Sequence, residues 1–224
     1  MKKNIVYIGD THGVSLLFSL LLKSLKKDTT YIHVGDVGLG FVDYNQDIAL
    51  LTRINHLLIL QNNELLLLRG NHDNPNFWNL DLKLSNVKLV KDYEVLDNHL
   101  FIGGAISVDR TLRTINKDYW ENEKIIEKDV TNLKGIEVVV THSKTKIQPP
   151  YTINNFIKEI SKKDKSLLIE LDEEQEYLTK VYKDLSVNND IKLWINGHFH
   201  NSNTTYFEKT KFVTLDINEF YEEL

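Results

Sequence analysis

Residues 4–13 read NIVYIGDTHG, a short apolar run that ends in a polar turn. The run Asn4–Ile8 is rich in β-branched and aromatic side chains, which is typical of a buried strand. Asp10 and His12 follow this run directly, and residues 14–26 then repeat apolar side chains at helical spacing. The stretch predicts a strand, a loop that carries a carboxylate and an imidazole, and a helix.

The same order continues along the first third of the chain. Tyr31–Val34 and Glu64–Leu68 are predicted strands, and Asp47–Asn62 between them is a predicted helix. Strands that alternate with helices indicate a largely parallel sheet. Beyond it we expect a hairpin of Tyr93–Leu96 and His99–Ile102, a polar helix after Trp120, strands Ile136–Val140 and Ile191–Ile195, helical residues 153–186, and a closing hairpin of Thr204–Phe207 and Phe212–Leu215.

Clusters of aspartate, histidine and asparagine follow five of the predicted strands. In open α/β sheets, ligands bind at the edge where the carboxyl ends of the strands meet. We therefore expect residues that are far apart in the sequence to form one composite site. The clusters contain Asp10 with His12, Asp36, Asn71 to Asp73, His142, and His198 with His200.

The composition narrows the possible classes of protein. The chain has 224 residues, of which 42% are apolar, and it shows no linker or repeat, so we expect one domain over residues 1–224. The absence of cysteine excludes disulfides, thiol catalysis and thiolate metal sites, and it suits a cytoplasmic location. The apolar start ends at Asp10, too soon for a signal peptide. The formal net charge of -5 predicts neither long duplex DNA nor a membrane as partner.

The clusters supply carboxylate, imidazole and amide donors for metal ions. Taken singly, each has a plain structural explanation: Asp10 is placed to cap the following helix, and a lone histidine such as His142 is usually a hydrogen-bonded structural residue. Five clusters behind five strands outweigh these explanations. Two divalent cations set against two carboxylates keep a net positive charge that suits a phosphate. We therefore expect a two-metal site with seven ligands: Asp10, His12, Asp36, Asn71, His142, His198 and His200.

Five motifs in this order resemble the calcineurin-like metallophosphoesterase superfamily. They are Gly9-Asp10-Thr11-His12-Gly13, Gly35-Asp36, Gly70-Asn71-His72-Asp73, Thr141-His142 and Gly197-His198-Phe199-His200. The resemblance implies an α/β fold, a four-layer α/β/β/α sandwich with two mixed sheets. It also implies that Asp36 bridges two metal ions, with Asp10, His12 and His200 on the first and Asn71, His142 and His198 on the second.

The resemblance further implies hydrolysis of a phosphate ester by a hydroxide that bridges the metals. His72 would protonate the leaving oxygen, and Asp73 would fix the tautomer of His72. Spacing alone does not separate His72 from a metal ligand. Adjacent residues at an extended strand end point in different directions, however, so we expect Asn71 to bind metal and His72 to catalyse.

The chain departs from the protein-phosphatase branch of the superfamily, which carries Asp-Arg-Gly after the second motif. Here residues 35–40 read GDVGLG and contain no arginine. Residues 103–110 instead resemble bacterial and phage-type members that have a tryptophan after the third motif, as Trp78 is here. We expect Arg110 and Arg113 to bind substrate from that segment, or else to pair with nearby acidic residues such as Asp109, Asp118 or Glu121. Lys144 and Lys146 are candidates for steering an anion inward.

The function expected from these features is metal-dependent hydrolysis of a phosphomonoester. The substrate would be a small molecule, a nucleotide or a phosphopeptide, and the oligomeric state is left open. The alternatives are a phosphodiesterase that acts on nucleotides or nucleic acid and, in another class, a noncatalytic interaction scaffold. We expect two divalent cations, with manganese ahead of iron, zinc, nickel and cobalt.

Overall fold

Two β-sheets lie face to face in the computed structural model, which describes residues 4–41, 43–150, 153 and 155–222. The first sheet has the strand order β11-β1-β2-β3-β4. Strands β1 to β4 are parallel, and β11 runs antiparallel to β1 at one edge. The strands are β1 (Asn4–Ile8), β2 (Thr29–His33), β3 (Glu64–Leu67), β4 (Val87–Leu89) and β11 (Phe220–Glu222).

The second sheet has the strand order β5-β6-β7-β8-β10-β9. The four inner strands are parallel, whereas β5 and β9 are antiparallel edge strands that form hairpins with their neighbours. The strands are β5 (Val95–Leu96), β6 (His99–Ile102), β7 (Val138–Thr141), β8 (Leu193–Asn196), β9 (Asn203–Phe207) and β10 (Thr210–Thr214). Both predicted hairpins are confirmed.

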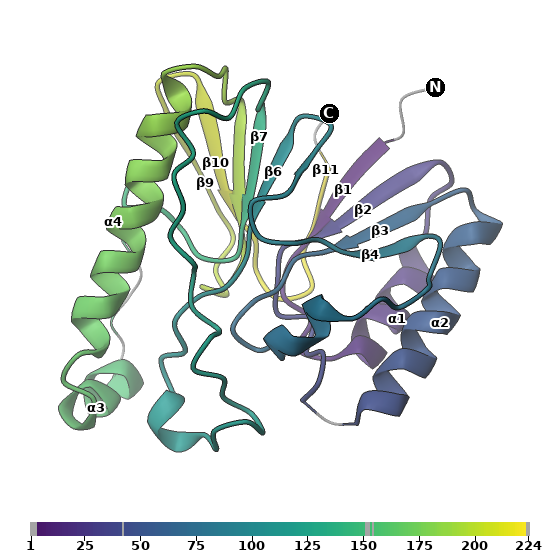
Figure 1. Cartoon of the computed structure of the whole chain (residues 1–224), viewed down its shortest axis with the longest axis horizontal. Helices are drawn as coiled ribbons and strands as arrows, with labels where there is room; N and C mark the ends of the chain where they lie inside the picture. The colour runs from purple at the N-terminus through teal and green to yellow at the C-terminus, as the bar shows by residue number, and fades with distance from the viewer. Residues whose placement is uncertain (1–3, 42, 151–152, 154, 223–224) are drawn as a thin grey trace.

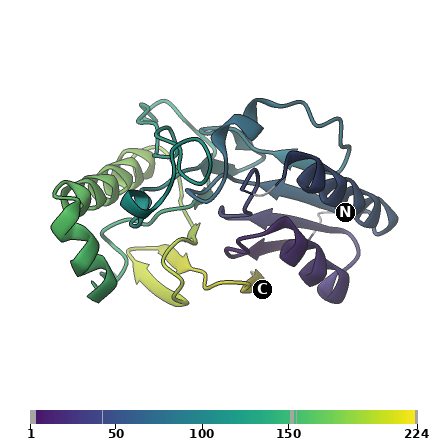
Figure 2. The same cartoon turned by 90° about the horizontal axis from the view of Figure 1, so that it is seen from below.

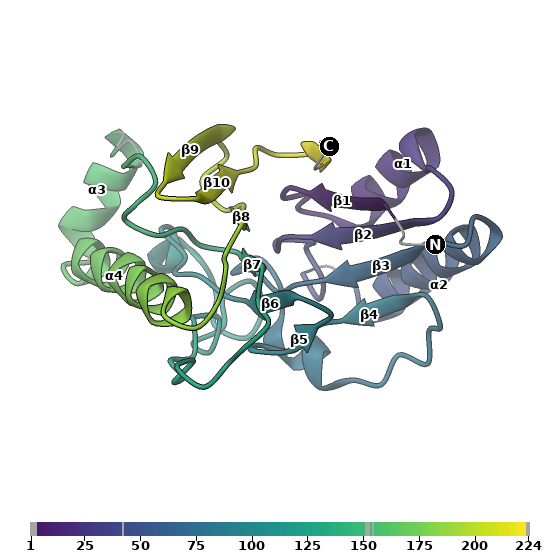
Figure 3. The same ribbon diagram turned by 90° about the horizontal axis from the view of Figure 1, so that it is seen from above.

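Helices cover the outer faces of the two sheets (Figure 1). The first sheet is covered by α1 (Val14–Ser24) and α2 (Tyr44–Leu60), and the second by α4 (Leu167–Ser186), with α3 (Asn155–Lys163) beside one end of α4. Two short 3-10 helices, η1 (Pro75–Asn79) and η2 (Arg110–Leu112), lie in the connecting loops. From above, the order helix, sheet, sheet, helix is visible (Figure 3), so the predicted four-layer α/β/β/α sandwich with two mixed sheets is confirmed.

Side chains alternate between the two faces of each sheet. In β1, Val6 and Ile8 pack with α1 and α2, whereas Tyr7 lies in the core between the sheets. In β7, Val139 packs with the apolar side of α4, and Val140 lies between the sheets. Because both faces of the inner strands are covered, these strands are apolar along their whole length. Burial on both sides also fixes the positions of the strand ends.

The fold differs from the sequence prediction in four places. The polar helix expected after Trp120 is wrong, since the structure has only turns and loop there. Side chains from elsewhere bind the backbone of that segment: Arg69 donates to the carbonyl oxygens of Glu123 and Lys124, and the Tyr177 hydroxyl accepts from Lys128 N. The region predicted as helical over 153–186 forms two helices, and strands β4 and β11 were not predicted.

The carboxyl ends of the parallel strands lie at one end of the sandwich. Figure 2 looks at this end, with the two groups of helices on opposite sides and the connecting loops between them. No helix in the described ranges is both long and apolar enough to cross a membrane.

Candidate metal centre

Five loops bring the predicted ligands together at this end of the sandwich. Asp10 and His12 follow β1, Asp36 follows β2, and Asn71 follows β3, while His142 follows β7 and His198 and His200 follow β8. The first two loops are joined by their backbones, because Thr11 N and His12 N both donate to the carbonyl oxygen of Asp36, at 3.1 and 2.8 Å. The site is therefore built by both sheets.

Two groups of donor atoms contain the residues that the family resemblance assigns to the two metals. In the first group, His200 Nε2 lies 3.2 Å from Asp10 Oδ2 and 3.0 Å from His12 Nε2. In the second, His142 Nε2 lies 3.1 Å from Asp36 Oδ1, and His198 completes the group. Within each group of three, the donor atoms lie within 4.8 Å of one another.

Asp36 connects the two groups. Its Oδ1 faces His142, and its Oδ2 lies 3.9 Å from His12 Nδ1, so the two oxygens point toward different groups. The side chain is buried. Burial alone raises the pKa of this carboxyl, but the positive charges of His142 and His72 outweigh burial and hold the pKa well below its ordinary value. Asp36 therefore lies between the two groups, and the family resemblance assigns it the role of a bridging carboxylate.

Asn71 presents its amide oxygen to the second group. Its Oδ1 lies 3.1 Å from His142 Nε2, and its Nδ2 donates to Ser107 Oγ at 3.0 Å. Ser107 N in turn donates to a buried carboxyl oxygen of Glu123 at 2.8 Å. Ser107 and Glu123 thus fix which way the Asn71 amide faces. Neither residue was predicted from the sequence, although Ser107 lies within residues 103–110, the segment that resembles bacterial and phage-type members.

The tautomer of His142 is set by the backbone. Its Nδ1–H donates to the carbonyl oxygen of Val34, at 3.0 Å, and its Nε2 faces the oxygens of Asp36 and Asn71, to which it donates when protonated and where it would bind a cation once that proton is lost. Burial lowers the pKa of His142, yet the charges of Asp36 and Asp10 outweigh it and raise that pKa to about 9. The centre therefore stabilises positive charge at this point.

Four of the expected ligands adopt a left-handed backbone. The φ angles are 51° at His12, 59° at Asp36, 68° at His198 and 47° at His200. Residues other than glycine rarely take this conformation, and such strain is concentrated at functional sites. Close approach adds a second constraint: a Cβ on Gly70 would lie 2.0 Å from Asp36 Oδ1. Only glycine allows the third loop to pass this close to the second.

The donor set fits two divalent cations. Asp10 and Asp36 are buried carboxylates, and burial of a carboxylate is costly unless a cation or hydrogen bonds compensate it. The remaining donors are imidazole nitrogens and one amide oxygen, and such N and O sets suit first-row metals of intermediate softness. The fold therefore brings together, in two groups, the residues that the family resemblance assigns to each metal.

His72 lies beside both groups and beside Arg113. It forms a third possible donor group with His12 and Asp36. Its ring stacks on Phe41 with centroids 5.5 Å apart, and Arg113 Nη2 lies 2.5 Å from its Nε2. Burial lowers the pKa of His72 to about 4, and the charge of Arg113 acts in the same direction while Asp36 opposes it. Position alone is compatible with an acid or a ligand, but the neighbouring guanidinium disfavours a metal cation at this ring.

The structure gives Asp73 a different role from the expected one. Its carboxylate oxygens accept from the backbone N–H groups of Val37, Gly38, Leu39 and Gly70, at 2.8 to 3.3 Å. Both oxygens are taken up by these bonds rather than by the ring of His72. Asp73 therefore holds the glycine-rich loop over the site, and the expectation that it orients His72 is corrected.

The two arginines that were candidates for binding substrate contact different parts of the molecule. Arg113 reaches His72 and also pairs with Asp109 at 2.7 Å. Arg110 instead donates to Asp164 and Glu170, with distances of 2.6 to 3.0 Å, so its guanidinium is engaged away from the metal centre. The expected substrate contact of Arg110 is corrected to a structural one.

The two candidate steering lysines also differ. Lys146 lies on the outside of the molecule and pairs with Asp172 and Glu176 on α4. Lys144 is buried, and its ammonium lies over the ring of Phe199 and donates to the carbonyl oxygen of Pro149. Only Lys144 therefore remains near the site.

Comparison with known proteins agrees with this geometry. A family model described as calcineurin-like phosphoesterase matches residues 3–202. No curated protein sequence matches the chain significantly.

Solved structures also resemble the chain, at low identity. A protein of unknown function from Aquifex aeolicus is 16% identical, with a TM-score of 0.43, and the match covers 89% of this chain and 80% of that one. A phosphopantetheinyl hydrolase from Mycobacterium tuberculosis is 11% identical, with a TM-score of 0.45 and coverage of 97% and 92%. A protein serine/threonine phosphatase from Saccharomyces cerevisiae is 15% identical, with a TM-score of 0.36 and coverage of 96% and 67%. On the family match, which spans most of its length, the chain belongs to the calcineurin-like phosphoesterase family.

Proposed function

We propose that the protein is a metal-dependent phosphomonoesterase. The observation that carries the proposal is the meeting of two donor groups at the buried carboxylate of Asp36. Asp10, His12 and His200 would hold one cation, and Asn71, His142 and His198 the other. When bound, the two cations would polarise the phosphoryl oxygens and lower the pKa of a water so that it attacks phosphorus at neutral pH.

Arg113 supplies the positive charge that the glycine-rich loop lacks. Its side chain is 7% exposed, and Asp109 and the carbonyl oxygen of Asp118 hold it in place. A guanidinium binds phosphate oxygens through paired N–H donors. A phosphate between Arg113 and His72 would accept the hydrogen bond that Arg113 Nη2 now directs at the His72 ring. Nε2 of His72 would then be available to transfer a proton to the leaving oxygen.

The test is hydrolysis of p-nitrophenyl phosphate and of its bis-ester by the protein with manganese and with chelator. We expect turnover of the monoester that chelator abolishes and that His72→Ala nearly abolishes. Arg113→Ala should lower kcat/KM roughly ten- to hundredfold, because it removes a hydrogen bond to a charged group. Arg53→Ala, which changes an exposed arginine on α2, should leave kcat/KM unchanged.

A phosphodiesterase is the second candidate, and one observation favours it. Two cavities border the expected ligands: one of about 440 Å³ is lined by His198 and His200, and one of about 380 Å³ by His12 and His72. A diester carries an organic group on each side of phosphorus, and two cavities would receive them. Faster turnover of the bis-ester than of the monoester would select this candidate.

A further inference from the structure

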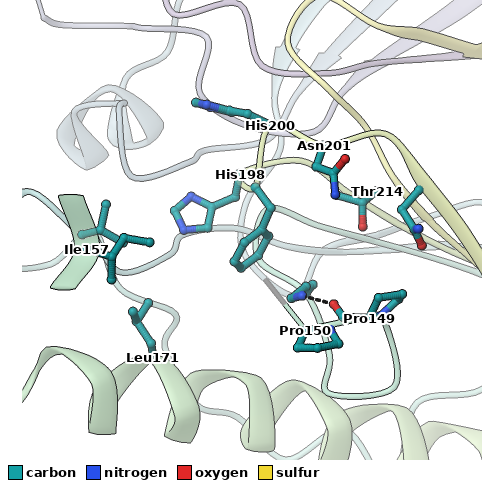
Figure 4. A pocket seen from close by; sticks show the side chains of 12 residues that line it. Pro149, Pro150, Ile157, Leu171, His198, His200, Asn201 and Thr214 are labelled. Atoms are coloured by element: carbon teal, nitrogen blue, oxygen red, sulfur yellow. Dashed lines mark hydrogen bonds between the residues drawn. The ribbon is translucent and has the colours of Figure 1, made fainter. Parts of the chain in front are cut away.

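The larger cavity at the centre lies between two expected ligands and the helices of the second half of the chain. It has a volume of about 440 Å³, which is within the range of sites for small organic molecules. Figure 4 shows His198 on one side of it, with Ile157 of α3 and Leu171 of α4 facing it and Pro149 and Pro150 on another side. The cavity therefore opens directly onto the metal centre.

Much of the wall of this cavity is apolar. Besides the two prolines, it includes Val108, Ile157, Leu171 and Phe199. Leu171 is buried in a small core with Ile106, Ile160 and Leu167, separate from the cores of the two sheets. This small core fixes α4 and α3 as a wall for the cavity.

A second set of contacts fixes the same wall. Arg110 donates to Asp164 and Glu170, and also to Ser166 Oγ, and these residues lie in and around the turn between α3 and α4. The side chain of Arg110 is 11% exposed, so the network is largely screened from water. The wall that α3 and α4 form is therefore held in place both by packing and by polar contacts.

The rest of the lining is polar and includes one ammonium group. Lys144, Asn201, Asn203 and Thr214 line the cavity together with the two histidines. Lys144 is 3% exposed, and its ammonium is held by the carbonyl oxygen of Pro149, the contact drawn in Figure 4, and by the ring of Phe199. An ammonium that is shielded from water in this way binds an acceptor or anionic group more strongly than a cation in water does.

We propose that this cavity binds the organic group of the substrate, and that the substrate is a small phosphate ester with a compact apolar body and an acidic or hydrogen-bond-accepting substituent that meets Lys144. The inference rests on the proposed phosphoesterase function, since the phosphate must lie at the metal centre. The cavity beside His12 and His72 is less suited to this role, because no lysine or arginine is among its lining residues within the described chain.

Three phosphonates that cannot be hydrolysed test the proposal by calorimetric titration of the manganese-loaded protein. Methylphosphonate carries only a methyl group, phenylphosphonate carries an apolar ring, and para-carboxyphenylphosphonate adds an acidic group to that ring. We expect phenylphosphonate to bind roughly tenfold or more tighter than methylphosphonate, because the ring leaves water. The carboxylate should add at least about a further threefold.

Two variants locate these gains. Ile157→Trp fills the cavity and should remove most of the gain of the phenyl group while leaving methylphosphonate affinity unchanged. Phe156→Trp changes the neighbouring exposed residue on α3 and is its control. Lys144→Met should remove only the gain of the carboxylate, and Lys146→Met, on the outer surface, should leave that gain intact. Unchanged melting temperatures establish that the variants are folded.

The outcomes separate failure of the inference from failure of the proposed function. If all three phosphonates bind equally well, or if Ile157→Trp leaves the gain of the phenyl group intact, the metal centre stands and the inference about the cavity is wrong. If para-carboxyphenylphosphonate still binds more tightly than phenylphosphonate in Lys144→Met, the role assigned to Lys144 is wrong. If manganese-loaded protein binds none of the three, the proposed function itself fails.

Discussion

At the scale of single residues, the centre depends on backbone positions that most residues cannot occupy. The glycine before each of several ligands allows one loop to touch the next: a Cβ on Gly197 would lie 2.1 Å from Asp10 Oδ1, and one on Gly70 would lie 2.0 Å from Asp36 Oδ1. Both contacts are with carboxylates that we propose as metal ligands. A methyl group at either glycine would therefore displace a ligand before it disturbed the core.

Gly70→Ala tests this reading. We expect the added methyl to push Asp36 away from its place between the donor groups, so that bound manganese falls by about half or more while the protein stays folded. Metal content is measured by mass spectrometry after gel filtration, with circular dichroism as the folding check. Gly135→Ala is the matched control, because Gly135 has a φ of 77° but nothing within 4 Å of an added Cβ. It should cost about 1 kcal/mol of stability and no metal.

At the scale of elements, α3 and the first turns of α4 are held by polar contacts as well as by packing, whereas the later turns of α4 pack in the core of the second sheet. The packing of α3 and these first turns is the small cluster of Ile106, Ile160, Leu167 and Leu171, and the Arg110 network lies next to it. Ion pairs that are largely shielded from water leave uncompensated charges when one partner is removed. Arg110 thus stabilises the position of α3 and the start of α4, which form the wall of the cavity, and is not a substrate ligand.

Arg110→Ala is expected to loosen this element without emptying the metal centre. The free energy of unfolding should fall by about 2 to 3 kcal/mol, because Asp164 and Glu170 lose their shared partner. Hydrogen exchange should become faster in residues 155–171 and stay unchanged in β1 to β3. Loss of bound metal in this variant, with exchange in α3 and α4 unaltered, would contradict the assignment.

At the scale of the whole molecule, two mixed sheets share one buried interface, and polar groups buried near their common end make stability depend on pH. Glu123 is fully buried, and one of its oxygens accepts from Ser107 N. Burial raises the pKa of this carboxyl to about 7. The folded protein therefore keeps a proton at pH values where the unfolded chain has released it.

The sign of the pH dependence follows from this difference. Between the ordinary glutamate value of 4.5 and about 7, the folded state binds more protons than the unfolded state, so stability falls as pH rises through that window. A shift of this size corresponds to about 3 kcal/mol once both states have ionised at higher pH. Glu123→Gln should remove this fall and be the more stable protein at pH 8, as measured by urea denaturation. Parallel pH profiles for the two proteins would show that Glu123 is ionised in the folded state.

Most of the sandwich and the meeting of the ligand clusters could be predicted, because both follow from local pattern. Apolar runs followed at once by Asp, His or Asn mark strand ends, and carboxyl ends of parallel strands share one edge. The two hairpins were also predictable, the first from Asp97-Asn98 between its strands and the second from two neighbouring strand-like runs. These features require no knowledge of distant partners.

What could not be predicted depends on contacts between distant residues. Arg110 pairs with Asp164 and Glu170, which lie more than fifty residues away in the sequence. The local sequence around Arg110 and Arg113 does not show which of these two arginines lies near the metal centre. Asp73 accepts hydrogen bonds from backbone N–H groups that converge on it only once the glycine-rich loop is folded. The three-residue strands β4 and β11 are defined by pairing with β3 and β1, and carry too few residues to show alternation.

The stoichiometry of manganese bound to the native protein, to Asp36→Ala and to His72→Ala tests the central claim most directly. If Asp36 joins two cation sites and His72 acts on substrate, the native protein and His72→Ala should each bind two ions, and Asp36→Ala should bind fewer. Catalysis should be lost in both variants. Two ions retained by Asp36→Ala, or ions lost from His72→Ala, would contradict the assignment of the centre.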